Sequence, residues 1–284
     1  MNALPRGRIL LALARQELRI VLRARWVAAY VVVFAALTLA VSYFGLAVIE
    51  VAGFQEFDRT AVSLLNLVLY VVPLAVMLMA VQGFREEGGA TDQLFTEPVA
   101  RTEIVLGKLL GLGAAHTLAT LLGFGFTGVL VALKVGTQGL ESYLVLVGFT
   151  ILAGAVFLPL GALLTVLSGR RTRSYAVVLV AWFLMVLLFD LVAIGLAFVL
   201  PDAWGNRVAF LCVFLNPADA TRVGAMLAIS GKETFGPAGA QLVRGLGGEA
   251  RAVALLVGTL LAWAAATSAG AAAALRRQDL HSGA

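Results

Sequence analysis

The 284-residue sequence is poor in the residue types from which crosslinks, metal sites and active sites are built. It contains a single cysteine, Cys212, which excludes an intrachain disulfide and any CxxC redox or metal motif. Two histidines and scattered carboxylates offer no set of acid, base, nucleophile and metal ligands of the kind that an enzyme needs. We therefore expect no enzymatic activity and no cofactor or metal bound by this chain.

Charge is also scarce, because only 13% of the residues are charged and 61% are hydrophobic. The mean hydropathy of +0.97 is typical of a polytopic membrane protein. A membrane-spanning helix needs about 20 apolar residues, and backbone in lipid must form its hydrogen bonds internally, which favours helices. The first apolar run is too long for a cleaved signal peptide, so we expect it to be retained. Six runs predict spans: Trp26–Ile49, Ala61–Gly83, Ile104–Leu133, Tyr143–Leu167, Ala176–Leu200 and Ala252–Leu275.

The basic residues between these runs predict the orientation of the chain, since cytosolic loops are enriched in Lys and Arg. The other side would hold only Arg59, Lys134 and five basic residues in the loop 201–251. We therefore expect both termini in the cytosol of a cell whose inner (plasma) membrane holds the chain, with anionic lipid beside the basic loops. The pattern does not favour nucleic-acid binding. The expected cytosolic residues are Arg6, Arg8, Arg15, Arg19, Arg23, Arg25, Arg85, Arg101, Arg170, Arg171, Arg173, Arg276 and Arg277.

Residues 1–25 predict an amphipathic helix that lies at the inner face of the membrane before the first span. Arg8, Arg15, Arg19 and Arg23 fall on one side of a helix with 3.6 residues per turn, and apolar residues fall on the other. Glu17 interrupts the apolar side. It would either meet a basic partner surface or pair with an arginine.

A charged island of 20 residues, Phe84 to Glu103, separates the second and third apolar runs. Gly88-Gly89 interrupts the helix that continues from the second span, and Thr91-Asp92 can cap a short new helix. Pro98 would end that helix. A short helix across the cytosolic ends of two spans is suited to docking a moving partner, although an ordinary solvated loop would show similar charges.

The loop 201–251 is too long to be a simple connection. Asn216 can cap a helix with Pro217 in its first position and Asp219 three residues after the cap, and this helix would run to about Ser230. We expect outer-leaflet helices here. These helices, which include Arg222, would close the mouth of a dimer or dock a periplasmic partner, or else cover the spans passively.

Two ionisable residues, His116 and Asp190, fall near the middle of the third and fifth predicted spans. Such groups in lipid usually have a partner. The sequence allows them to pair across the bundle as polar contacts between helices, and a proton or cation path is the alternative.

The island and its surroundings resemble the segment after the second helix in type-2 ABC transporter permeases. The resemblance rests on Glu86-Glu87-Gly88-Gly89, Leu94-Phe95 before Pro98-Val99-Ala100-Arg101, and Leu106-Gly107-Lys108 with Gly111. Gln16-Glu17-Leu18-Arg19, the order of the spans and Asn216-Pro217-Ala218-Asp219-Ala220 with Arg222 extend it over essentially the whole chain. It implies the fold of a type-2 ABC exporter membrane domain. It also implies that the island forms a coupling helix seated on an ATPase, a role carried onto Glu86, Glu87, Asp92, Leu94, Phe95 and Arg101.

The ATPase itself is expected in a separate chain. A Walker loop needs GxxxxGK[ST], but Gly107-Lys108 has Thr102 and Leu109 in the flanking positions, and Gly231-Lys232 has Met226 and Glu233. ATP and Mg would therefore be bound by a cytosolic ATPase dimer. Six spans form half of a translocation unit, which implies a second copy of this chain or a paralogue.

Within the family the chain is most similar to permeases of nitrous oxide reductase maturation, whose systems assemble a copper site and include an accessory periplasmic protein. Direct copper conduction is poorly supported, because Met77 and Met79 would point in different directions on a helix and no MxxM pair is present. An exporter permease for a lipid, drug or polysaccharide is the alternative. A secondary transporter is disfavoured because the sequence shows no convincing internal repeat.

We expect one membrane domain over residues 1–284. The second cytosolic loop, Ser168–Tyr175, contains Arg170, Arg171 and Arg173, which would either contact the ATPase or serve topology alone. The expected segments are the interfacial helix 1–25, spans one and two in 26–83, the coupling loop 84–103, spans three to five in 104–200, the extracytoplasmic loop 201–251, and span six with the tail in 252–284.

Overall fold

A computed structural model describes residues 6–52, 57–84, 100–137, 139–200, 202–231 and 243–282, and the described residues contain helices and no strand. The expectation of an all-helical chain is therefore confirmed for these residues. The helices are α1 (Arg6–Arg23), α2 (Arg25–Ala52), α3 (Phe57–Phe84), α5 (Arg101–Val135), α6 (Leu140–Ser168), α7 (Arg171–Phe183), η1 (Leu184–Leu188), α8 (Phe189–Val199), α9 (Asp202–Leu215), α10 (Pro217–Ser230) and α12 (Glu249–Ser282).

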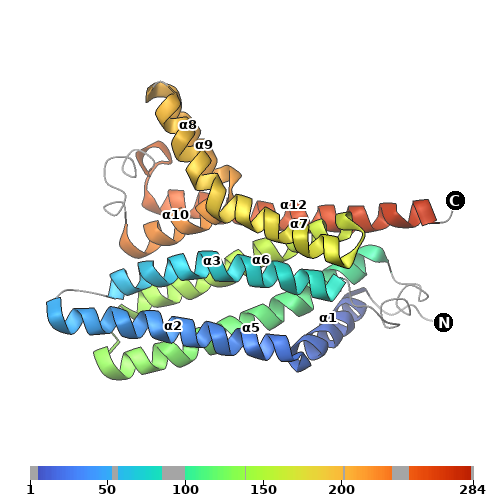
Figure 1. Ribbon diagram of the computed structural model, residues 1–284, viewed down its shortest axis with the longest axis horizontal. Helices are drawn as coiled ribbons and strands as arrows, with labels where there is room; N and C mark the ends of the chain where they lie inside the picture. The colour runs from blue at the N-terminus through green and yellow to red at the C-terminus, as the bar shows by residue number, and fades with distance from the viewer. Residues whose placement is uncertain are drawn as a thin grey trace.

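Long apolar helices form the body of the molecule. Five of them in the described residues can cross a membrane by length and composition, and α2 becomes a sixth if it is counted with α1 as one pair bent by 69°. Helices α2, α3, α5, α6 and α12 run along the long axis of the molecule (Figure 1). Helix α1 and the end of α12 lie at the same end of this bundle (Figure 1).

The core lies where α3, α5 and α6 pack together and are covered by α2, α10 and α12. An aromatic row joins α2, α5 and α6: the Phe34 and Phe124 ring centroids are 5.3 Å apart, and those of Phe124 and Tyr143 are 5.5 Å apart. Thr38 and Thr127 form a 3.0 Å hydrogen bond between α2 and α5. Such polar contacts stabilise helix packing where lipid removes the hydrophobic driving force.

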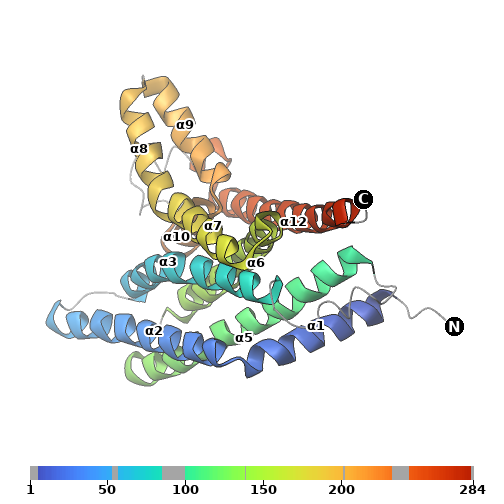
Figure 2. The ribbon, with the colours of Figure 1, turned by 45° about the vertical axis from the view of Figure 1, so that its right-hand side comes forward.

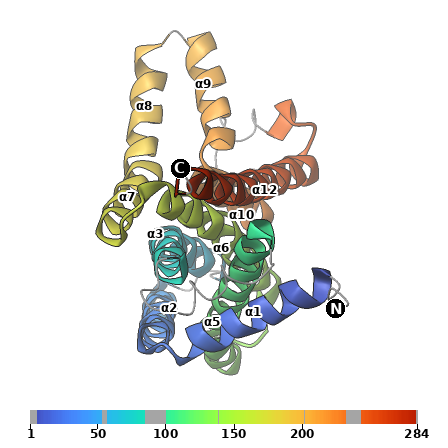
Figure 3. The same cartoon turned by 90° about the vertical axis from the view of Figure 1, so that its right-hand side faces the viewer.

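The fifth predicted span differs from the regular helix that the sequence suggested. It is interrupted by the π-helical turn η1, after which α8 and α9 form a hairpin that projects sideways from the bundle in every view (Figure 3). The exposed side chains of Leu191 and Val199, at 67% and 83%, show how little of α8 the rest of the chain covers. A π turn inserts one extra residue into a helical turn, which periodicity in an apolar run cannot reveal.

Candidate functional site

Helix α1 packs along the beginning of α5, at the end of the bundle where α12 finishes (Figure 2). The end of α3 lies beside both helices. Because α3 ends at Phe84 and α5 begins at Arg101, this is where the two ends of the charged island enter the bundle. We call this meeting point the junction; it consists of Glu17, Gly83, Gly107, Lys108 and Gly111.

The centre of the junction is a buried ion pair between α1 and α5. Lys108 Nζ donates a hydrogen bond of 3.3 Å to Glu17 Oε2, and both side chains are buried. The same ammonium donates to the carbonyl oxygen of Gly83, beside the carboxyl end of α3, where the helix dipole favours a cation. One lysine therefore connects three helices.

Two glycines of α5 allow α1 to approach this closely. A Cβ atom at Gly107 would lie 2.5 Å from Leu13 Cβ, and one at Gly111 would lie 2.6 Å from Glu17 Cβ and 2.7 Å from the Ala14 carbonyl oxygen. Real Cβ atoms do not approach other atoms to such distances. The helix backbones can thus meet only if these positions lack side chains, as in close helix packing elsewhere in membranes.

The first turn of α5 is held at both sides. Glu103 Oε2 accepts a 3.2 Å hydrogen bond from the backbone nitrogen of Ala100, which satisfies a free amide at the helix start. Arg276 of α12 donates to the Thr102 hydroxyl at 3.4 Å. The returning end of the island is therefore fixed to the last predicted span as well as to α1.

The predicted coupling residues fall mostly outside the described residues. This applies to Glu86, Glu87, Asp92, Leu94 and Phe95, and the coupling role of these five stays a prediction. Arg101 is described and occupies the first position of α5, partly exposed.

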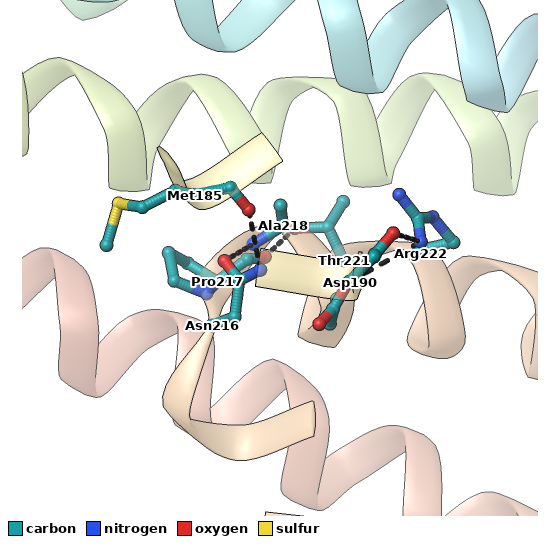
Figure 4. Close-up of polar contacts among 8 residues, drawn as sticks. Met185, Asp190, Asn216, Pro217, Ala218, Thr221 and Arg222 are labelled. Atoms are coloured by element: carbon teal, nitrogen blue, oxygen red, sulfur yellow. Dashed lines mark hydrogen bonds and ion pairs between the residues drawn. The ribbon is translucent and has the colours of Figure 1, made fainter. Parts of the chain in front are cut away.

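A second polar site lies where α10 meets the bend in the fifth span, in the part of the chain that the sequence predicted to lie on the outer side (Figure 4). Asn216 accepts a 3.1 Å hydrogen bond from Ala218 N, which confirms it as the cap of a helix with Pro217 in its first position. Its Nδ2 also donates 2.7 Å to the carbonyl oxygen of Met185, inside the π turn. The buried Asn216 amide thus caps α10 and links it to the π turn by a hydrogen bond.

We expect Asn216→Ala to lower the free energy of unfolding by about 1–3 kcal/mol, because it removes a helix cap and leaves the partly buried Met185 carbonyl oxygen without its donor. Thermal unfolding in detergent would measure the loss. Asn216→Asp keeps the cap acceptor but replaces the donor to Met185 with a negative charge, so it shows how much of the loss belongs to the contact with Met185 and its surroundings. An unchanged melting temperature for Asn216→Ala would contradict this assignment.

Next to this contact, two carboxylates share one guanidinium. Arg222 Nη1 pairs with Asp190 Oδ2 of α8 and lies 3.5 Å from Asp219 Oδ1 of α10. Because both carboxyl groups contact the same Arg222 nitrogen, they lie close to one another. We call Asp190, Asn216, Asp219 and Arg222 the outer cluster. Of the predicted mouth residues, Arg222 thus pairs with Asp190 directly and Asp219 shares the same guanidinium, whereas Asn216 contacts Met185 in the adjacent π turn.

The expected pairing of His116 with Asp190 is wrong. Asp190 pairs with Arg222, whereas buried His116 places Nε2 3.4 Å from the Thr150 carbonyl oxygen and 3.5 Å from the Thr120 hydroxyl. His116 packs directly against Gly154 of α6. It therefore serves as a polar contact between α5 and α6, whereas Asp190 lies just after the π turn and pairs with α10.

The loop before α7, which the sequence predicted to be cytosolic, exposes its three arginines to solvent. Arg170, Arg171 and Arg173 are exposed, and Ser174 donates a 3.0 Å hydrogen bond to the Arg170 carbonyl oxygen at the start of α7. Their exposure is compatible with contact to an ATPase and equally with a role in topology alone.

Comparison with known proteins gives the family. The profile described as "ABC-2 family transporter protein" matches residues 11–280. The chain belongs to the ABC-2 transporter family. It is similar to a protein of Pseudomonas aeruginosa named "Probable ABC transporter permease protein NosY", with 33% identity over 219 residues that cover 74% of this chain and 79% of the relative. A protein of the same name from Stutzerimonas stutzeri is 32% identical over 234 residues, which cover 80% of this chain and 83% of the relative.

Membership of this family makes the chain the membrane subunit of a transporter and not its ATPase. No group of three or more His, Cys, Asp or Glu side chains that could hold a metal occurs within the described ranges. Met77 and Met79 are both buried in α3.

Sequence reasoning missed the most connected residue of the junction. Glu17 pairs with Lys108, a partner that the sequence reasoning did not consider. The sequence did contain a signal for this pair. Glu17 lies on the apolar side of the first helix and Lys108 lies just inside the third predicted span, and a charge in either place needs a partner of opposite charge.

Proposed function

We propose that the permease is the membrane half of an ATP-driven machine in which a separate cytosolic ATPase dimer, carrying ATP and Mg, acts on the island 84–103. The observation that carries this proposal is the junction, because both ends of the island enter the bundle at helices that one buried lysine connects. A push on the island would therefore move α1, α3 and α5 together. A second copy of the chain completes the translocation unit.

In the proposed orientation the junction faces the cytosol and the outer cluster faces the other side of the inner membrane. The exposed arginines of α1, the loop before α7 and the end of α12 support this orientation, since basic residues concentrate on the cytosolic side. The ATPase can then reach the island. The α8–α9 hairpin and α10 would face a periplasmic partner.

We further propose a NosY-like role, in which ATPase motion serves copper-site assembly in nitrous oxide reductase through an accessory periplasmic protein of the NosD type. The names of the two relatives support this role. It is tested by expressing the permease in a denitrifying bacterium that lacks its own NosY and measuring nitrous oxide reduction and the copper content of the reductase. Restoration of both supports the role. Failure to restore either, with the permease present in the membrane, favours an exporter for a lipid, drug or polysaccharide.

Exchanging Glu86 and Glu87 for lysine is expected to abolish the effect of the permease on ATP hydrolysis, because it reverses the charge that would meet the ATPase. Hydrolysis by the partner ATPase would be measured with permease variants in nanodiscs. The matched control reverses two exposed carboxylates at the other end of the bundle, Glu141 and Glu249, which should leave coupling intact. Coupling that survives the reversal of Glu86 and Glu87 would remove their assigned role.

A further inference from the structure

The outer cluster lies where the fifth span changes direction. Asn216, Asp219 and Arg222 follow one another at three-residue intervals and so lie on one side of α10. That side faces the π turn and Asp190, the second residue of α8 (Figure 4). Beyond this contact the α8–α9 hairpin projects from the bundle. The cluster is thus one polar attachment between the hairpin and the helices that α10 packs on, α3, α6 and α12. A second is the 3.3 Å hydrogen bond from Trp263 Nε1 of α12 to the Phe214 carbonyl oxygen at the base of α9.

The charges in the outer cluster do not balance when both carboxylates are ionised. Arg222 offers the same nitrogen, Nη1, to Asp190 and to Asp219, and its buried Nε has no hydrogen-bond partner in the described part of the chain. Asp219 is only 8% exposed, so water screens it poorly. Two ionised carboxylates held against one guanidinium nitrogen repel each other. A proton on one of them removes this repulsion and provides a hydrogen-bond donor between the two groups.

We propose that Asp190, Asp219 and Arg222 form a proton-dependent clamp that fastens the α8–α9 hairpin to α10. With one proton on the carboxyl pair, the cluster is neutral overall and holds the bend closed. When that proton is lost, two carboxylates compete for one guanidinium, the second is repelled, and the hairpin can swing about the π turn.

The titration of Asp219 agrees with this arrangement. Burial, followed by the hydrogen bond and the charge of Asp190, raises the pKa of Asp219 from 3.8 to about 7, although Arg222 and Asn216 act in the opposite direction. An open clamp would return this carboxyl to water and to its ordinary pKa. The closed state therefore binds the proton more tightly, so the clamp is strongest below pH 4 and weakens as the pH rises from about 4 to about 7.

The surroundings of Asp219 contain few other titratable groups. Cys212 of α9 interacts with it, and burial raises the pKa of this thiol, so it stays neutral in the same pH range. Helices α3, α6 and α12 bring no charged group to Asp219 among the described residues. The pH response is therefore assigned to the two carboxylates and Arg222.

The clamp is tested by measuring a distance between α8 and α10 as a function of pH. Cys212 is changed to serine, and nitroxide labels are attached to cysteines that replace exposed Leu196 of α8 and exposed Ala228 of α10. In full-length permease in nanodiscs we expect one narrow distance at pH 5 and a second, longer one at pH 8. The pKa of Asp219 is about 7 in the closed clamp and would be 3.8 in the open one. This difference limits the increase in the population ratio of open to closed clamp between pH 5 and pH 8 to about 10²-fold.

Asp219→Asn imitates the protonated carboxyl and should give the narrow distance at both pH values. Asp190→Asn removes the competing carboxylate and should move the transition to lower pH by at least about one unit. Glu249→Gln, in an exposed position outside the cluster, should keep the pH response of the labelled parent. The clamp is overturned if the parent shows the same distances at pH 5 and pH 8, or if Asp219→Asn responds to pH as the parent does.

Discussion

Replacing Lys108 with methionine is expected to lower the free energy of unfolding by about 3–5 kcal/mol, because it leaves the buried Glu17 carboxylate without the ammonium that compensates its charge. The same change removes the donor to the Gly83 carbonyl oxygen. We expect a lower melting temperature in detergent and a smaller effect of the permease on its ATPase, since α1 is no longer fixed to α3 and α5.

A double-mutant cycle separates the ion pair from general damage to the core. Glu17→Gln alone should also destabilise the protein, since it leaves the Lys108 ammonium buried beside a neutral group. The double variant Glu17→Gln/Lys108→Met should lose clearly less than the two single changes added together. Strictly additive losses would show that the two side chains do not depend on one another, and the ion pair would lose its place at the centre of the junction.

Gly111→Ala is expected to destabilise the permease by about 1–3 kcal/mol, because the added methyl group has no room between α5 and α1. It would lie 2.6 Å from Glu17 Cβ and 2.7 Å from the backbone oxygen of Ala14, neither of which can move without displacing α1. The readout is again thermal unfolding, together with the rate at which α1 is cut by a protease.

The same helix provides the control. At Gly125 an added methyl group meets nothing within 4 Å, so Gly125→Ala should be neutral or should stabilise α5 by up to about 1 kcal/mol through helix propensity. If Gly111→Ala behaved like Gly125→Ala, the close contact of α1 with α5 would be contradicted. The contrast between the two glycines therefore tests packing and not propensity.

Local patterns were sufficient to predict the helices. Apolar runs of about 20 residues in a chain with little charge indicate spanning helices without any knowledge of packing. The start of α10 could also be predicted from neighbouring residues, because an Asn cap followed by Pro in the first helical position is a typical beginning of a helix.

Partners across the bundle could not be predicted in the same way. Glu17 and Lys108 are 91 positions apart in the sequence, and their meeting depends on the two glycines that admit α1. The sequence allowed Asp190 to pair with His116 because both residues fall at a similar depth in the membrane, and a sequence gives no other information on their relative positions. The π turn changes the direction in which the residues after it point around the helix axis. This change cannot be predicted from a segment that is apolar on all sides.

The most direct test of the account is whether ATPase and permease form one coupled complex. The gently solubilised permease would be purified from its own membranes, and the co-purifying ATPase would be quantified and assayed before and after its removal from the permease. The account predicts one ATPase per permease chain and a rate of hydrolysis that changes when the two are separated. A permease that never retains an ATPase, or whose removal leaves hydrolysis unchanged, would contradict it.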